Sequence, residues 1–189
     1  MIEEINRLKS EAFSGRNLRL LREWEILDQR LANRSDIDYK VARFNAKGIA
    51  VEYDIFYHIR SFCGIDSEQK PLYSNEFALR LVIPEGFPCI DSPVELFFLT
   101  VDESNRDRAC PWHPNIRYHG AFRGRVCLNK MDSFTEIAWC VERVASYLRY
   151  ERYHALNHPP FPEDLTVAKW VVEYGEPMGY INQLLSYGK

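Results

Sequence analysis

Hydrophobic residues recur at helical spacing over the first 34 residues and alternate with polar residues after them. One face of the first segment would collect four large apolar side chains: Leu20, Trp24, Leu27 and Leu31. Gly15 interrupts the periodicity, because glycine is a poor helix former. The pattern therefore predicts a short leading helix, a break, and a main helix from about residue 16 to residue 33.

Four later segments alternate apolar and polar side chains, which is the pattern of half-buried strands. Short links between consecutive strands favour an antiparallel meander, since parallel neighbours need long crossover connections. Ser133 and Glu136 have capping-box spacing and predict the start of a long helix. Two helices are expected in the tail, so the predicted fold class is α+β, with helices against one antiparallel sheet. The predicted strands are 39–44, 49–59, 77–83 and 94–100, and the predicted tail helices are 165–174 and 179–186.

Composition narrows the class of protein. The chain has 189 residues, of which 46% are hydrophobic and 27% charged, so it can bury a sizeable core. A net charge of −3 disfavours nucleic acid as a partner, and no uncharged apolar run has the ~20 residues of a membrane helix. The acidic start is unlike a secretory signal, and the five cysteines include no CxxC pair. We expect a cytoplasmic protein with reduced thiols, no cofactor and no membrane partner.

The residues that could take part in catalysis or metal binding lie in an irregular segment from residue 102 to residue 132. A loop of this length in a compact domain is usually functional or disordered, and its aromatic residues argue against disorder. Cys127 lies near its end, two residues after Arg125, and a nearby cation favours the reactive thiolate. The remaining cysteines need no role beyond that of small core hydrophobes: Cys63, Cys89, Cys110 and Cys140.

Two further chemistries use the same segment. A zinc site would have four ligands: Cys110, His113, His119 and Cys127. The seven residues between the last two ligands are unlike the tight pairs of structural zinc sites. A cysteine hydrolase would need a histidine base, and the candidates are His113, His119 and His154. No local hydrolase signature accompanies them.

Taken together, residues 16–150 resemble the ubiquitin-conjugating enzyme family, whose fold is called the UBC fold. The order of helix, four strands, irregular flap and helix agrees with that family. The stretch Ile83-Pro84-Glu85-Gly86-Phe87-Pro88, followed by Pro93, looks like the proline-rich segment before the family's fourth strand. His113-Pro114-Asn115 matches the family's HPN tripeptide, and Gly124-Arg125-Val126-Cys127-Leu128 is similar to its G-x-[IV]-C-L active-site segment.

The resemblance implies an activity. Cys127 would accept a ubiquitin-like modifier protein from an activating enzyme as a thioester and transfer it to an amine of a protein target. Asn115 would donate to the oxyanion formed during transfer, or would hold the loop by bonding backbone groups. His113 and Pro114 would support the flap. The acidic residue that assists the incoming amine would be one of three: Asp132, Glu151 or Asp164.

Three departures separate the chain from the usual family pattern. Asn115 and Cys127 are unusually far apart, the tryptophan and proline that commonly follow the cysteine segment are missing, and the tail differs. These differences look like those of divergent bacterial relatives encoded beside ubiquitin-like proteins, some of them antiviral. We expect residues 1–157 to form the catalytic domain and residues 158–189 a helical extension. The alternative is a non-catalytic binding or scaffold module with the same fold.

Overall fold

The computed structural model describes residues 2–89, 91–102, 104–128 and 135–186. Helices α1 (Ile2–Lys9) and α2 (Gly15–Leu31) open the chain, as the hydrophobic period predicts. Gly15 has a φ of +55°, a backbone conformation that favours glycine, and it stands where the two helices separate. The face of α2 that carries Trp24 is buried against the sheet.

A four-stranded antiparallel sheet forms the centre of the molecule. Its strands follow the order β1-β2-β5-β6, which agrees with the predicted α+β meander. The meander is interrupted between β2 and β5, where β3 and β4 form a separate two-stranded hairpin that the sequence pattern did not predict. The four strands of the sheet are β1 (Ile37–Phe44), β2 (Ala50–Tyr57), β5 (Phe77–Val82) and β6 (Glu95–Phe98); those of the hairpin are β3 (Ser61–Ile65) and β4 (Pro71–Ser74).

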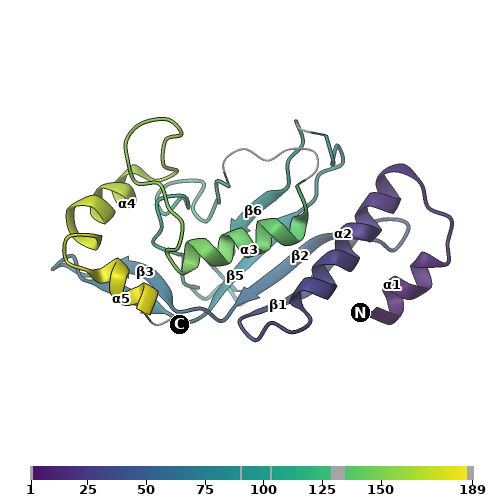
Figure 1. The fold of residues 1–189 in the computed structure, drawn as a ribbon, viewed down its shortest axis with the longest axis horizontal. Coiled ribbons are helices and arrows are strands. Elements are labelled where there is room, and N and C mark those ends of the chain that lie inside the picture. Colours follow the sequence, from purple (N-terminus) through teal and green to yellow (C-terminus); the bar gives the residue numbers. More distant parts are fainter. Residues whose placement is uncertain (1, 90, 103, 129–134, 187–189) are drawn as a thin grey trace.

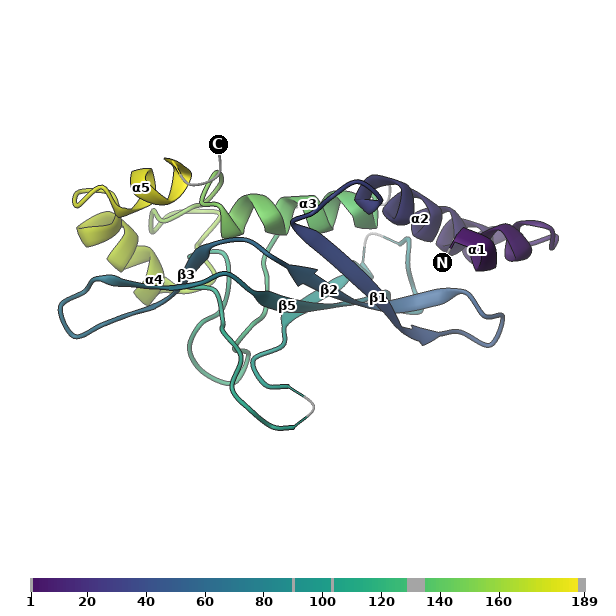
Figure 2. The ribbon, with the colours of Figure 1, turned by 90° about the horizontal axis from the view of Figure 1, so that it is seen from below.

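Helices α2 and α3 (Ile137–Leu148) cover one face of this sheet (Figure 2). The predicted capping box is wrong, because α3 begins at Ile137 and its N-cap position is Glu136; Ser133 lies outside the described residues. The cap comes instead from Glu23 on α2, a buried carboxylate that accepts a 2.8 Å hydrogen bond from the Ile137 amide. Burial raises the pKa of Glu23. A long-range contact therefore sets where α3 starts.

The tail packs beside the β3–β4 hairpin (Figure 1). It contains α4 (Leu165–Trp170), a π-helical turn η1 (Val171–Gly175) and α5 (Tyr180–Ser186), where two helices were predicted. These elements share an apolar cluster with the hairpin and the irregular segment, separate from the main core. Trp170 reaches the turn of the hairpin, and its indole N–H donates to the Gln69 carbonyl at 3.0 Å. The cluster is built on Phe62, Trp112, Tyr150, Val167, Trp170, Val171, Ile181 and Leu184.

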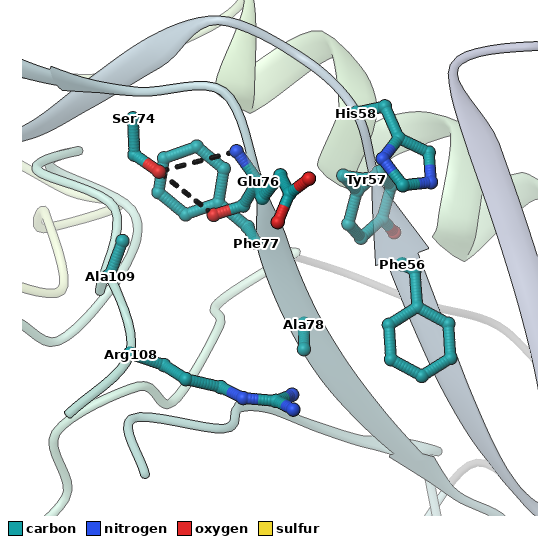
Figure 3. A pocket seen from close by; sticks show the side chains of 9 residues that line it. All are labelled: Phe56, Tyr57, His58, Ser74, Glu76, Phe77, Ala78, Arg108 and Ala109. Carbon is teal, nitrogen blue, oxygen red and sulfur yellow. Dashed lines mark hydrogen bonds between the residues drawn. The ribbon is translucent and has the colours of Figure 1, made fainter. Parts of the chain in front are cut away.

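The other face of the sheet holds a cavity of about 320 Å³ (Figure 3). Its lining includes Phe56 and Ala78, which pair across β2 and β5, and the side chain of Arg108 from a separate segment. None of its lining residues belongs to the HPN or cysteine segment. No helix in the described part of the chain is long and apolar enough to cross a membrane.

Candidate active site

Asn115 and Cys127 lie opposite each other at the base of a hairpin. The Cys127 amide donates to the Asn115 carbonyl at 2.9 Å, and the next residues inward, Ile116 and Val126, form an antiparallel bridge. Arg117 continues the pairing with a 2.8 Å hydrogen bond to the Arg125 carbonyl. The long interval between the HPN tripeptide and the cysteine is thus a hairpin whose tip is residues 118–123. We call this element, residues 115–127, the flap hairpin.

The cysteine arm of the flap hairpin is fixed to the edge of the sheet. The Phe98 amide donates to the Gly124 carbonyl at 2.9 Å, and the Val126 amide donates to the Leu96 carbonyl at 3.0 Å. Gly124 has a φ of +95°, and a Cβ added to it would lie 2.5 Å from the Phe98 carbonyl oxygen. Only glycine permits this close approach to β6. The glycine of the G-x-V-C-L segment therefore places Cys127 relative to the sheet.

His113 supports the opposite arm from within the core. It is fully buried, and its ring stacks on Tyr147 with centroids 4.7 Å apart. Nδ1 accepts the Asn115 amide at 3.1 Å, so Nε2–H donates to the Arg152 carbonyl at 3.1 Å. Burial lowers the pKa of His113 to about 3. A neutral ring with both nitrogens engaged supports the backbone and offers no free base.

The Asn115 side chain connects the flap hairpin to the segment after α3. It is 2% exposed, and its Oδ1 accepts the His154 amide at 3.0 Å. Because Oδ1 has this partner, the side-chain NH₂ group is the end that can donate to a reacting oxygen. The geometry thus accommodates both roles expected of Asn115, which are not exclusive.

Cys127 differs from the other cysteines in its surroundings. It is partly exposed, and its carbonyl accepts a 3.2 Å hydrogen bond from the Tyr147 hydroxyl on α3. Cys110 and Cys140 are buried, and burial raises the pKa of their thiols to about 11 and about 12. Cys89 is exposed and Cys63 is partly exposed, but both lie outside the flap hairpin, and burial raises the pKa of the Cys63 thiol. All five cysteines are free thiols.

The geometry does not support the zinc alternative. Cys110, His113, His119 and Cys127 all lie in the described part of the chain, where no group of three or more potential ligands could hold a metal ion. Both nitrogens of His113 bond backbone groups, and Cys110 carries a raised pKa that disfavours the thiolate a metal requires.

Asp164, one of the three candidate acids, is committed to structure. It is the N-cap of α4, and its carboxylate also accepts the backbone amides of Tyr118 and His119 and lies 3.1 Å from His119 Nδ1. These hydrogen bonds outweigh the effect of burial and hold the pKa of Asp164 below its usual range. The Asp164 amide in turn donates to the Pro114 carbonyl at 3.0 Å. Asp164 therefore fastens the tail to the flap hairpin.

Glu151 is the candidate acid that lies beside the site, and Asp132 falls outside the described residues. Glu151 is exposed at the mouth of a cavity of about 310 Å³ between α3 and the flap hairpin. His154 also contributes to this cavity, whereas His119 is held by Asp164.

Sequence reasoning missed Arg143 and Tyr147, whose spacing of four on α3 places them on one face. The lining residues are Asn115, Arg143, Tyr147, Glu151, Arg152, Tyr153 and His154.

The fold is that of ubiquitin-conjugating enzymes. The structure is similar to that of the H. polymorpha ubiquitin-conjugating enzyme Pex4p in complex with the soluble domain of Pex22p. The TM-score is 0.54 at 15% identity, over 92% of this chain and 96% of that one. It is also similar to a Plasmodium yoelii structure described as a ubiquitin-conjugating enzyme, with a TM-score of 0.51 at 19% identity over 93% and 95% of the two chains. No protein-family model and no curated protein matches the sequence.

Proposed function

We propose that this protein is a conjugating enzyme for a ubiquitin-like modifier and that Cys127 carries the modifier as a thioester. The observation that carries the proposal is the placement of Cys127. In a fold shared with ubiquitin-conjugating enzymes, Cys127 is partly exposed and lies at the base of the flap hairpin. Its backbone pairs there with that of the asparagine of an HPN tripeptide. A buried structural cysteine would need neither the exposure nor this pairing.

The proposed reaction has two steps. The Cys127 thiolate attacks the carbonyl carbon of the modifier's C-terminal thioester on the activating enzyme, a new C–S bond forms, and the activating enzyme's cysteine leaves as thiolate. An amine of the target then attacks the same carbon. A C–N bond forms, the bond to Cys127 breaks, and the amine gives up a proton to a base or to solvent. The Asn115 amide donates to the oxyanion between these events.

The modifier, the activating enzyme and the protein target are the partners that this reaction requires. Five free thiols agree with a reducing compartment, so we place the protein in the cytoplasm. Its sequence departures from the family support a bacterial conjugation system that acts against phage. Its partners would then be encoded beside it, and these neighbours are the first modifier and activating enzyme to assay.

The test is formation of an adduct on a non-reducing gel with a candidate modifier, its activating enzyme and ATP. The wild-type protein should give an adduct that reductant removes, and Cys127→Ala should give none. Cys127→Ser should give a slower-forming ester that survives reductant. Cys89→Ala is the matched control, because it removes an exposed thiol outside the flap hairpin and should leave the adduct unchanged.

A labile adduct that persists in Cys127→Ala would overturn the assignment. If a demonstrably charged activating enzyme never transfers its modifier to this protein, across the neighbouring candidates and ubiquitin, the binding or scaffold alternative replaces the enzyme. Unchanged biological function in cells that carry Cys127→Ala would support the same alternative.

Two variants of Asn115 separate its two roles. Asn115→Asp keeps an oxygen that can accept the His154 amide but loses the donor, whereas Asn115→Ala loses both. If Asn115 stabilises the oxyanion, both variants slow transfer to an amine by roughly 10²–10³-fold while thioester formation remains. If it only holds the loop, Asn115→Asp transfers much faster than Asn115→Ala. Thermal unfolding of each variant measures the structural contribution separately.

A further inference from the structure

Two arginines beside Cys127 have no carboxylate partner among the described residues. Arg143 on α3 and Arg152 after it both line the 310 Å³ cavity. Arg143 lies against the rings of Trp139 and Tyr147, at 5.6 and 5.7 Å from the centroids, and its buried Nε has no hydrogen-bond partner. The backbone of Arg152 is held by the hydrogen bond between its carbonyl and His113.

Other arginines of the protein lie in ion pairs with carboxylates. Asp36 pairs with Arg34 and Arg149, and Glu163 pairs with Arg117 and Arg125. Arg30 likewise pairs with Glu136 and Glu142. Within the cavity the only carboxylate in the lining is Glu151, which forms no ion pair with either arginine in the described structure. Two guanidinium groups that form no ion pair in the described structure therefore line the same cavity.

Two residues that line this cavity, Tyr147 and Asn115, are hydrogen-bonded to the backbone of Cys127. Tyr147, which contacts Arg143, donates its hydroxyl to the Cys127 carbonyl, and Asn115 accepts the Cys127 amide with its own carbonyl. Both residues line the cavity. A polypeptide that brings an amine to Cys127 from this side would lay its neighbouring side chains over the two arginines.

We propose that the Arg143–Arg152 cavity binds an acidic side chain, Asp or Glu, of the acceptor polypeptide close to the lysine that receives the modifier. The inference deepens the proposed function and rests on it for its biological meaning. Guanidinium groups form two parallel hydrogen bonds to carboxylates, and both rings under Arg143 limit the freedom that it would lose on binding.

The test uses the thiol itself as an anchor and needs neither modifier nor activating enzyme. Short peptides whose acceptor lysine is replaced by a thiol side chain are supplied as mixed disulfides with β-mercaptoethanol. The Cys127 thiolate attacks the peptide sulfur and releases β-mercaptoethanol, and the exchange equilibrium is read by mass spectrometry. Each peptide with Glu one, two or three residues from the thiol is compared with its Gln counterpart. The full chain carries Cys89→Ser so that the exposed thiol does not compete, and Cys127→Ser gives the background.

We expect at least one Glu peptide to be captured about tenfold better than its Gln counterpart, as one hydrogen-bonded charge pair would give. The preference should fall about tenfold in Arg143→Gln and in Arg152→Gln, and high salt should weaken it. Arg106→Gln is the matched control. It removes the same charge from an exposed site outside the cavity and should keep the preference.

Equal capture of Glu and Gln peptides by the wild-type protein at every spacing would overturn the proposal. So would a preference that survives in Arg152→Gln, a variant that alters an exposed side chain and should fold normally. Charging of Cys127 by a modifier, measured separately, distinguishes the two proposals. Charging without an acid preference rejects the cavity assignment alone, and an acid preference without charging rejects the enzyme assignment alone.

Discussion

Individual residues of the site divide into those with a local sequence signal and those without one. The HPN tripeptide and the G-x-V-C-L segment mark Asn115 and Cys127, and the structure pairs the two. Arg143 and Tyr147 carry no such signal, because they lie on a helix whose pattern only predicts burial, and only the fold brings α3 beside Cys127. Asp164 was a candidate acid because of its proximity in sequence, but its carboxylate caps helix α4.

His113 predicts a pH dependence of stability. Its pKa in the folded protein is about 3, below the usual value of 6.5, so the unfolded chain binds a proton more readily. Its contribution is complete above the unfolded pKa and is lost as pH falls from about 6.5 toward 3, at up to about 1.4 kcal/mol per pH unit. Denaturant unfolding of wild type and His113→Gln between pH 7 and pH 5 measures it. The variant should show the weaker pH dependence, and parallel curves would contradict this.

At the scale of elements, local pattern predicted the helices and the four strands of the sheet but not the β3–β4 hairpin. Its strands are five and four residues long and are joined through Asp66, whose carboxylate accepts the amides of Glu68 and Lys70. Alternation over so few residues is a weak signal. The start of α3 was mispredicted for another reason: the Glu23 cap is 114 residues away in sequence.

We predict that Asp164 stabilises the contact between the tail and the flap hairpin. Asp164→Ala removes the α4 cap and the acceptor for two flap amides, and we expect a loss of about 2–3 kcal/mol in the free energy of unfolding. Hydrogen exchange at the Tyr118 and His119 amides should accelerate by more than the loss in the global free energy of unfolding explains. Asp164→Asn keeps an acceptor oxygen and should lose less. Equal stability of wild type and Asp164→Ala would show that the link is dispensable.

The whole molecule has two apolar clusters, and the second belongs to the tail and the site region together. Phe62 on β3 lies 5.0 Å from the ring of Tyr150 and 5.6 Å from that of Trp170. Trp112, which directly precedes the HPN tripeptide, packs against the same tryptophan at 6.1 Å. The cluster therefore joins residues on both sides of residue 157, after which the helical extension is predicted to begin.

Removal of the tail should destabilise the protein as a whole. Trp170 is 3% exposed, and Trp170→Ala should cost about 3–5 kcal/mol while unfolding remains a single transition. A chain of residues 1–157 would expose Phe62 and Trp112 and should melt lower or aggregate. Val172→Ala, at an exposed apolar position of η1, is the control and should change little. A 1–157 chain as stable as the full protein would make the tail an independent appendage.

The flap hairpin can accept additional residues at its tip. Pairing at its base holds the backbone of Cys127, so the number of residues in the tip does not set the position of this residue. Lengthening a loop also costs little entropy. The tip has exposed residues at Gly120 and Phe122, and foreign sequence inserted there should leave the backbone pairing of Cys127 unchanged. Under the proposed function, a reporter or a recognition peptide placed there would lie close to the acceptors of Cys127.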